Sequence, residues 1–133
     1  MIAIVDDDNF AREGISSLLL SFGYTASSFA SAEEFLASGL VDGTTCLITD
    51  VHMPGMSGLE LQKHLNEERR CPPIIFMTGY FSERARAQAL EAGAVAYFGK
   101  PLREGSLIDS IKKALDGATG TRTSPCYPTG NSN

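Results

Sequence analysis

Cysteine is scarce in the sequence, and the placement of its cysteines excludes two classes of small protein. Cys46, Cys71 and Cys126 are odd in number, lie far apart and never form a CxxC pair. A disulfide framework needs an even set of cysteines and a structural zinc site needs clustered ligands, so neither class fits. The pattern favours a protein of the reducing cytosol, and we expect a cytoplasmic location.

Long apolar runs and clusters of basic residues are also missing. No stretch approaches the roughly 20 apolar residues of a membrane-spanning helix. The chain begins MIAIVDDD, with no basic segment before its apolar residues, so we expect neither a signal peptide nor a membrane partner. The net charge is −5 and the 11 lysines and arginines are scattered, so we expect no direct binding to nucleic acid.

What the sequence does contain is the composition of one soluble globular domain. It has 133 residues, of which 43% are hydrophobic and 20% are charged. Three apolar runs, at 2 to 5, 46 to 48 and 73 to 77, show no alternation of polar and apolar residues, as is typical of strands buried on both faces. Weaker strands are predicted at 24 to 29 and 94 to 98.

The segments between these strands carry helical signals. The first segment has apolar residues at intervals of three and four, which predicts one apolar face, and Gly23 stands where a left-handed residue would end the helix. The apolar residues are Phe10, Ile15, Leu18, Leu19 and Phe22. Two later segments begin with the spacing of a capping box, Ser31 with Glu34 and Ser57 with Glu60.

Two further helices are predicted over 82 to 93 and 106 to 115, so that a strand and a helix alternate five times. Right-handed connections between such units predict an α/β fold, a doubly wound five-stranded parallel sheet with the flavodoxin-like strand order 2-1-3-4-5 and five helices. The domain is predicted over residues 1 to 116. Residues 117 to 133 are rich in Gly, Ser, Thr and Pro, and they predict a flexible tail or the start of a linker.

Charged and hydroxyl side chains follow four of the predicted strands. Asp6 and Asp7 follow the first strand, Asp50 the third, Thr78 the fourth and Lys100 the fifth. The carboxyl ends of parallel strands meet at one edge of a sheet, so we expect these side chains to lie close together. Each close pair of carboxylates would repel by roughly 4 kcal/mol at an effective dielectric constant of about 20, and Mg²⁺, which prefers oxygen ligands, would neutralise them. With a hydroxyl and an ammonium beside it, the site fits a phosphoryl group.

These residues lie in motifs that resemble the receiver domain of two-component response regulators over about residues 1 to 116. The matching motifs are IVDD near the start, TDVHMPGMSG around Asp50, MTG around Thr78, and AGAVAYFGKP, which ends with Lys100 and Pro101. The pattern is similar to that of FixJ-like receivers, which precede a LuxR-type helix-turn-helix. The resemblance implies a CheY-like fold and a signalling domain that is not an enzyme, although it promotes its own phosphotransfer and slow dephosphorylation.

The resemblance further implies that Asp50, exposed at its strand tip, is the phosphoacceptor nucleophile and takes a phosphoryl group from a sensor histidine kinase. It implies a Mg²⁺ or Mn²⁺ ion held by Asp7, by Asp50 and by the backbone carbonyl of His52, with Asp6 bound directly or through water. Asp8 either joins the outer part of this metal site or complements the dipole of the helix that follows.

The other roles implied by the resemblance concern phosphotransfer and switching. Lys100 and the Thr78 hydroxyl would each pair with a phosphoryl oxygen. Tyr97 would move into the space beside Thr78 after phosphorylation, or else it is an ordinary half-buried strand residue. His52 and Tyr80 would flank the path of the hydrolytic water and set the lifetime of the phosphoryl group.

The surface that reads out the change would comprise the helix at 82 to 93, the strand at 94 to 98 and the helix at 106 to 115. The family uses this surface to form homodimers or to control an output domain, here a DNA-binding transcriptional domain beyond this chain. One alternative, a phosphatase of the haloacid dehalogenase class, requires a second acid two residues after the nucleophile, where this chain has His52. The other alternative is a degenerate receiver that binds proteins without being phosphorylated.

Overall fold

Five strands form a single parallel sheet in the computed structural model of the chain, which describes residues 1–101 and 103–119. The strands lie in the order β2-β1-β3-β4-β5, and every neighbouring pair is parallel. Their bounds are β1 (Ile2–Val5), β2 (Ala26–Phe29), β3 (Cys46–Asp50), β4 (Ile74–Thr78) and β5 (Ala96–Gly99). The predicted fold class and strand order are confirmed. The tail or linker predicted from residue 117 lies, from residue 120 onward, outside the described residues.

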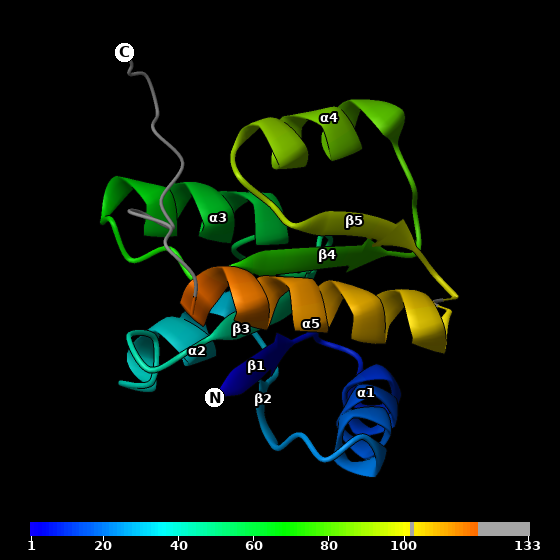
Figure 1. Cartoon of the computed structure of the whole chain (residues 1–133). Helices are drawn as coiled ribbons and strands as arrows, with labels where there is room; N and C mark the ends of the chain where they lie inside the picture. The colour runs from blue at the N-terminus through cyan, green and yellow to red at the C-terminus, as the bar shows by residue number, and fades with distance from the viewer. Residues whose placement is uncertain (102, 120–133) are drawn as a thin grey trace.

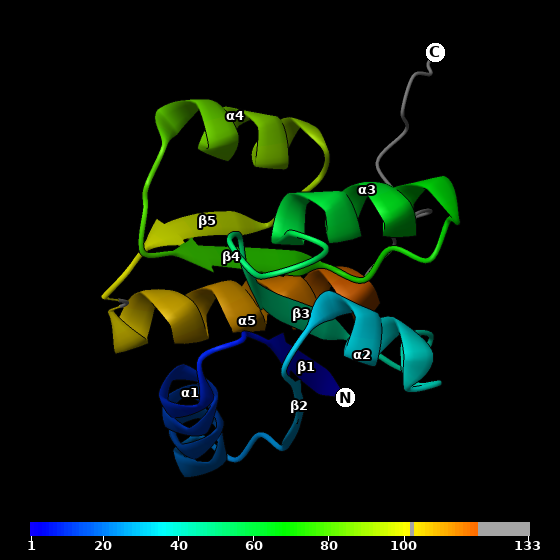
Figure 2. The same ribbon diagram turned by 180° about the vertical axis from the view of Figure 1, so that it is seen from behind.

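Five helices in the described part of the chain cover the two faces of the sheet (Figure 1). They are α1 (Asn9–Ser21), α2 (Ala32–Ala37), α3 (Gly58–Glu67), α4 (Glu83–Glu91) and α5 (Glu104–Thr119). Helices α1 and α5 pack on one face, and α2, α3 and α4 pack on the other, as the two opposite views show (Figures 1 and 2). Within the same residues, no helix combines the length and the apolar character that crossing a membrane requires.

Each face of the sheet has its own apolar core, which explains why the strand sequences do not alternate. In β1, Ala3 and Val5 belong to the core on the side of α2, α3 and α4, whereas Ile2 and Ile4 belong to the core on the side of α1 and α5. All four side chains are at most 3% exposed. Because a side chain on either face is buried, both faces favour apolar residues.

The apolar face predicted for α1 is only partly correct. Ile15 and Leu19 are buried, but Phe10 is 84% exposed and Phe22 is 52% exposed. Since successive helical residues turn by about 100°, Phe10 lies on the opposite side of the helix from Leu19. Phe22 follows the last helical residue, so it no longer shares the buried face. Gly23 has a φ of 87° and stands just past the helix end, as predicted.

The two predicted capping boxes differ from one another. At α3, Ser57 Oγ accepts a hydrogen bond from the Glu60 N–H at 3.1 Å, and Glu60 Oε1 accepts one from the Ser57 N–H at 2.9 Å, so this box is complete. At α2, Ser31 caps the Glu34 N–H at 3.0 Å, but the Glu34 carboxylate accepts from the Ala30 N–H at 2.6 Å. The α2 box is therefore wrong in one of its two bonds, because the carboxylate reaches one residue further back.

Candidate functional site

The carboxyl ends of β1, β3, β4 and β5 bring together the side chains predicted for the site. Asp6 and Asp7 directly follow β1, and Asp50 is the last residue of β3. Thr78 is the last residue of β4, and Lys100 directly follows β5. The register of the parallel sheet places these strand ends side by side. Residues from across the sequence thus meet at one edge of the sheet.

Three carboxylates form the centre of the site. Oxygen atoms of Asp6, Asp7 and Asp50 all lie within 4.8 Å of one another, a spacing that one cation can bridge. Asp6 is fully buried, Asp50 is 7% exposed and Asp7 is exposed. Burial raises the pKa of the Asp6 carboxyl above its ordinary value. The cluster combines oxygen ligands, excess negative charge and one solvent-facing carboxylate, which fits a Mg²⁺ ion that keeps several waters.

The burial of Asp50 corrects the expectation that this residue is exposed at its strand tip. Two neighbours hold its carboxylate inside the site: Lys100 Nζ lies 3.1 Å from Asp50 Oδ2, and the His52 N–H donates to Asp50 Oδ1 at 3.2 Å. Lys100 Nζ is also 3.1 Å from Asp6 Oδ2. Burial lowers the pKa of Lys100, but its hydrogen bonds to Asp50 and Asp6 outweigh this effect and raise the pKa above its ordinary value. Lys100 therefore stays charged and offsets part of the carboxylate charge.

Asp8 lies outside the carboxylate cluster and caps helix α1. Its Oδ1 accepts hydrogen bonds from the Phe10 N–H at 2.9 Å and from the Ala11 N–H at 3.4 Å. Its own backbone N–H donates to Asp6 Oδ1 at 2.9 Å. Of the two roles that the sequence left open, the geometry favours the one at the helix N-terminus.

Asp6→Asn should raise the stability of the metal-free protein. The change removes a buried charge, keeps an oxygen that accepts the Asp8 N–H, and leaves Lys100 paired with Asp50. Since the pKa of Asp6 is raised on folding, the folded protein binds more protons than the unfolded chain, and Asp6 lowers stability as the pH rises through this range. We expect a gain of roughly 1 kcal/mol near neutral pH, or about 4 °C in melting temperature, in thermal unfolding with a chelator present.

The pH dependence separates this effect from general changes in packing. The gain from Asp6→Asn should shrink as the pH falls and should disappear well below 3.8, the ordinary pKa of the carboxyl, where Asp6 is protonated in both the folded and unfolded wild-type chain. Asp8→Asn keeps the helix cap and removes a carboxylate outside the cluster, so it should show no such gain. A less stable Asp6→Asn protein at neutral pH would contradict the prediction.

A close backbone contact at Gly58 shapes the loop after Asp50. The Gly58 N–H donates to the Val51 carbonyl at 2.9 Å, which brings the first residue of α3 against the end of β3. A Cβ at position 58 would collide with the Asp50 carbonyl oxygen and would lie 3.1 Å from the Asp50 carbonyl carbon. A larger residue therefore requires the backbone of Asp50 to move.

Gly58→Ala should destabilise the protein by about 1 to 3 kcal/mol, the usual cost of adding atoms to a packed site. Chemical denaturation measures the change. Gly14→Ala is the matched control, because a Cβ at this position in α1 would meet no atom within 4 Å. The control should gain roughly 0.5 to 1 kcal/mol, as expected when alanine replaces a helical glycine. Equal free energies of unfolding for the two variants would show that a Cβ against the Asp50 carbonyl does not destabilise the protein.

Thr78 and Tyr97 are both buried beside the site. The Thr78 side chain is fully buried and its Oγ1 accepts a hydrogen bond from the Tyr80 N–H at 3.0 Å. Tyr97 is only 6% exposed, not half-buried, and its hydroxyl lies near the Ser82 backbone without a hydrogen bond of good geometry. Burial raises the pKa of this hydroxyl. The Tyr97 ring packs edge to face against Phe81, with ring centres 5.4 Å apart.

His52 and Tyr80, which the sequence placed along the path of the hydrolytic water, contact one another. Their rings meet edge to face with centres 5.6 Å apart and an angle of 84° between the planes. His52 is exposed and Tyr80 is 77% exposed, so the pair lies at the surface. The contact joins the loop that follows β3 to the loop that follows β4.

Sequence reasoning missed one contact of the loop after Asp50. Glu33 of α2 accepts a hydrogen bond from the Met56 N–H at 2.9 Å, and this bond lowers the pKa of the Glu33 carboxyl. Gly55 has a φ of 76°, and a Cβ there would lie 2.6 Å from Glu33 Oε2. Glu33 and Met56 are 23 positions apart, and no local sequence pattern indicates such a pair.

Comparisons with known proteins place the chain among signalling domains. A family model, the response regulator receiver domain, matches residues 2–112. The chain is 44% identical over 115 residues to the response regulator protein TodT of Pseudomonas putida, across 86% of this chain and 51% of TodT. It is 35% identical over 114 residues to the transcriptional regulatory protein FixJ of Azorhizobium caulinodans, across 86% of this chain and 54% of FixJ. The chain thus spans about half the length of the curated relatives it matches.

Solved structures share the fold. The response regulator StyR is 37% identical with a TM-score of 0.80, over 86% of this chain and 58% of StyR. The FixJ-N crystal structure is 32% identical with a TM-score of 0.77, over 86% of this chain and 92% of FixJ-N. Taken with the parallel sheet and the side chains at its carboxyl edge, the match over residues 2–112 shows that this chain belongs to the receiver-domain family of response regulators.

Proposed function

We propose that this receiver domain accepts a phosphoryl group on Asp50 from a sensor histidine kinase, in a reaction that requires Mg²⁺ or Mn²⁺. One observation carries the proposal: Lys100 Nζ lies 3.1 Å from an oxygen of Asp50 inside a cluster of three carboxylates. An ordinary ion pair needs one carboxylate, whereas a phosphoacceptor needs a nucleophile, metal ligands and a cation in one place. Membership of the receiver family supports the same chemistry.

Phosphotransfer would depend on the positions of three side chains. The Asp50 carboxylate attacks the phosphorus of the kinase phosphohistidine, so that a P–O bond forms while the P–N bond breaks. The electron pair of the broken bond stays on the imidazole nitrogen. Lys100 pairs with one oxygen of the transferred group, and the Thr78 hydroxyl donates a hydrogen bond to another.

The carboxylate cluster would hold the metal ion. Asp7, Asp50 and the backbone carbonyl of His52 are its proposed ligands, with Asp6 bound directly or through water. The three carboxylates carry more negative charge than Lys100 offsets, which supports this assignment. A bound divalent cation would offset the negative charge that gathers around the phosphoryl group.

Phosphorylation would also change the conformation of the domain. The phosphoryl group adds a charge of about −1.5 to −2, which attracts the Thr78 hydroxyl away from the Tyr80 N–H. Tyr97, which is buried beside Thr78, then moves into the space that the Thr78 side chain leaves. The surface of α4, β5 and α5 reports the change through a homodimer or a DNA-binding output domain beyond this chain. The length of relatives such as the transcriptional regulatory protein FixJ supports such a domain.

Tyr80→Ala should shorten the lifetime of phosphorylated Asp50. Tyr80 packs on His52 at the surface, so its ring would limit the approach of the hydrolytic water. Losing ~1 kcal/mol from the hydrolysis barrier would speed the loss of the phosphoryl group about fivefold, as followed by intact mass over time. Phe10→Ala removes another exposed aromatic side chain and should leave the lifetime unchanged. Equal lifetimes in wild type and Tyr80→Ala would exclude Tyr80 from this role.

Phosphorylation without a kinase tests the proposed function. The protein is incubated with acetyl phosphate and Mg²⁺, and its intact mass is recorded. We expect a gain of one phosphoryl group with the metal and none with a chelator. The alternative, a degenerate receiver that binds proteins without phosphorylation, predicts no gain in mass and no detectable Mg²⁺ binding by the folded protein.

A further inference from the structure

The side chain of Arg12 reaches back from α1 to the loop that carries Asp6 and Asp7. Its Nη1 donates a hydrogen bond to the Asp6 backbone carbonyl at 2.6 Å. Its Nη2 donates to Asn9 Oδ1 at 2.9 Å, so two partners hold the guanidinium in place. Arg12 is half-buried, and it forms no ion pair within the part of the chain that the structure describes. This arginine therefore contacts the backbone of the carboxylate cluster and not its side chains.

The Asp6 carbonyl belongs to the peptide group that joins Asp6 to Asp7. Because a peptide group is planar, a bond to its carbonyl oxygen also fixes the direction of the Asp7 N–H. The next peptide group, between Asp7 and Asp8, is held as well, since the Asp8 N–H donates to Asp6 Oδ1 at 2.9 Å. Each of the two peptide groups beside Asp7 is thus fixed by one hydrogen bond.

The Asp7 carboxylate has no side-chain contact of its own to hold it. It is exposed and makes no hydrogen bond or ion pair with the residues that the structure describes. One of its oxygens nevertheless lies within 4.8 Å of oxygens of Asp6 and Asp50. The backbone on either side of Asp7 therefore places this carboxylate in the cluster.

We propose that Arg12 is a positioning residue of the metal site, whose hydrogen bond to the Asp6 carbonyl holds Asp7 where it can bind Mg²⁺. The inference rests on the proposed function, in which Asp7 is a metal ligand. As a cation, Arg12 repels another cation, so its charge and its hydrogen bond have opposite effects on Mg²⁺ affinity. The sign of the change on replacing Arg12 tells which effect is larger.

Isothermal titration calorimetry of the full chain with Mg²⁺ provides the test. Arg12→Gln removes the charge and the guanidinium, and glutamine has a similar helix propensity. We expect the Kd for Mg²⁺ to rise about tenfold, a common result of losing a group that orients a metal ligand. Loss of the charge alone would instead lower the Kd. Asn9→Ala keeps the charge of Arg12 but removes one partner of its guanidinium, and it should raise the Kd by less, about threefold.

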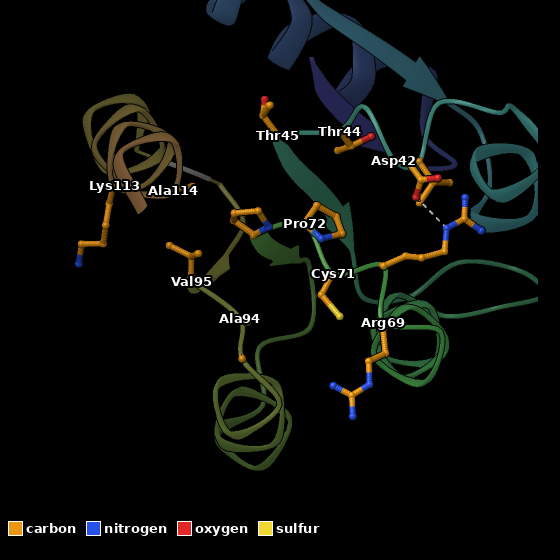
Figure 3. A pocket seen from close by; sticks show the side chains of 14 residues that line it. Asp42, Thr44, Thr45, Arg69, Cys71, Pro72, Ala94, Val95, Lys113 and Ala114 are labelled. Carbon is orange, nitrogen blue, oxygen red and sulfur yellow. Dashed lines mark hydrogen bonds and ion pairs between the residues drawn. The ribbon is translucent and has the colours of Figure 1, made fainter. Parts of the chain in front are cut away.

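Arg70→Gln is the matched control. Arg70 lines a cavity at the opposite edge of the sheet from the carboxylates. It is half-buried, as Arg12 is, and its Nε lies 2.9 Å from Asp42 Oδ1, the pair joined by a dashed line at Asp42 in Figure 3. The five residues of β4 separate the two edges by roughly 16 Å, beyond the Debye length of about 8 Å in physiological salt. The same change in charge should leave the Kd for Mg²⁺ unchanged there.

A second measurement needs no metal. Relaxation of ¹⁵N nuclei in the labelled, metal-free chain reports the motion of each backbone amide. We expect the order parameter of the Asp7 amide to fall from about 0.85, the value of a rigid backbone, to below about 0.6 in Arg12→Gln protein. The amide of Val5, inside β1, should keep its order parameter, because the hydrogen bonds of the sheet hold it.

Three results would overturn the inference. The first is a Kd for Mg²⁺ in Arg12→Gln protein that equals or falls below that of the wild type. The second is an unchanged order parameter of the Asp7 amide. The third is an equal rise in Kd in Arg70→Gln protein. Wild-type protein that binds no Mg²⁺ would overturn the proposed function as well, which separates the two failures. If Arg12→Gln protein does not fold, an unchanged Kd in Asn9→Ala protein decides against the inference.

Discussion

Asp50→Asn protein will gain no phosphoryl group from acetyl phosphate in the presence of Mg²⁺. Two carboxylates, Asp50 and Asp6, each lie 3.1 Å from Lys100 Nζ, so contact with Lys100 alone does not select the acceptor. Asp6 is fully buried and its pKa is raised by burial, whereas Asp50 retains an exposed fraction of 7%. We therefore expect Asp50 to be the carboxylate of this pair that a phosphoryl donor reaches. Asparagine has an amide nitrogen in place of one carboxylate oxygen and is a poor nucleophile, so no gain in mass should be detectable.

The control for this experiment is Asp8→Asn, which also exchanges a carboxylate for an amide close to the site. Asp8 caps α1 and lies outside the cluster, and asparagine is an equally good cap, so this variant should be phosphorylated like the wild type. Circular dichroism should show the same helix content in both variants. A phosphoryl group on Asp50→Asn protein, mapped by peptide mass to Asp6, would move the acceptor to the neighbouring strand end.

Asp7→Asn should weaken Mg²⁺ binding by on the order of 100-fold, because it removes one negative charge from the proposed ligands of the ion. Asp7 is the exposed member of the cluster, and it makes no hydrogen bond or ion pair with the residues that the structure describes. Its replacement should therefore leave the metal-free fold intact. Isothermal titration calorimetry with Mg²⁺ measures the loss directly.

Stability measurements separate a metal effect from a folding effect. Without metal, Asp7→Asn and wild type should unfold at nearly the same temperature, and Mg²⁺ should raise the melting temperature of the wild type far more than that of the variant. Asp8→Asn again serves as the matched control and should bind Mg²⁺ like the wild type. An unchanged Mg²⁺ affinity in Asp7→Asn protein would mean that the ion lies elsewhere and that the cluster is not its site.

The architecture was predictable because both faces of the sheet are covered. Strands buried on both faces, such as β1 and β4, appear in the sequence as continuous apolar runs. The helices between them need one apolar face, which appears as apolar residues at intervals of three and four. The errors lie where a residue sits near a helix end. Phe10 and Phe22 have the right residue type for a core, but Phe10 lies on the opposite side of α1 from Leu19 and Phe22 follows the last helical residue, so both are exposed. Spacing alone does not set where a helix begins and ends.

The composition of the site was predictable for a related reason. Parallel strands all point the same way, so polar residues that follow β1, β3, β4 and β5 must meet at one edge. The contacts among them were not predictable. The bond of Lys100 to both Asp6 and Asp50, the contact of His52 with Tyr80, and the burial of Asp50 depend on how the loops fold over the edge.

The sequence by itself determined the order of strands and helices, the residues at the strand ends and their resemblance to a receiver domain. These follow from local periodicity, from the direction of the chain and from short motifs, all of which are properties of neighbouring residues. The tertiary structure decided which carboxylates share Lys100 and how deeply each of them is buried. Burial and pairing arise from side chains that are distant in sequence, and only their packing in space fixes them.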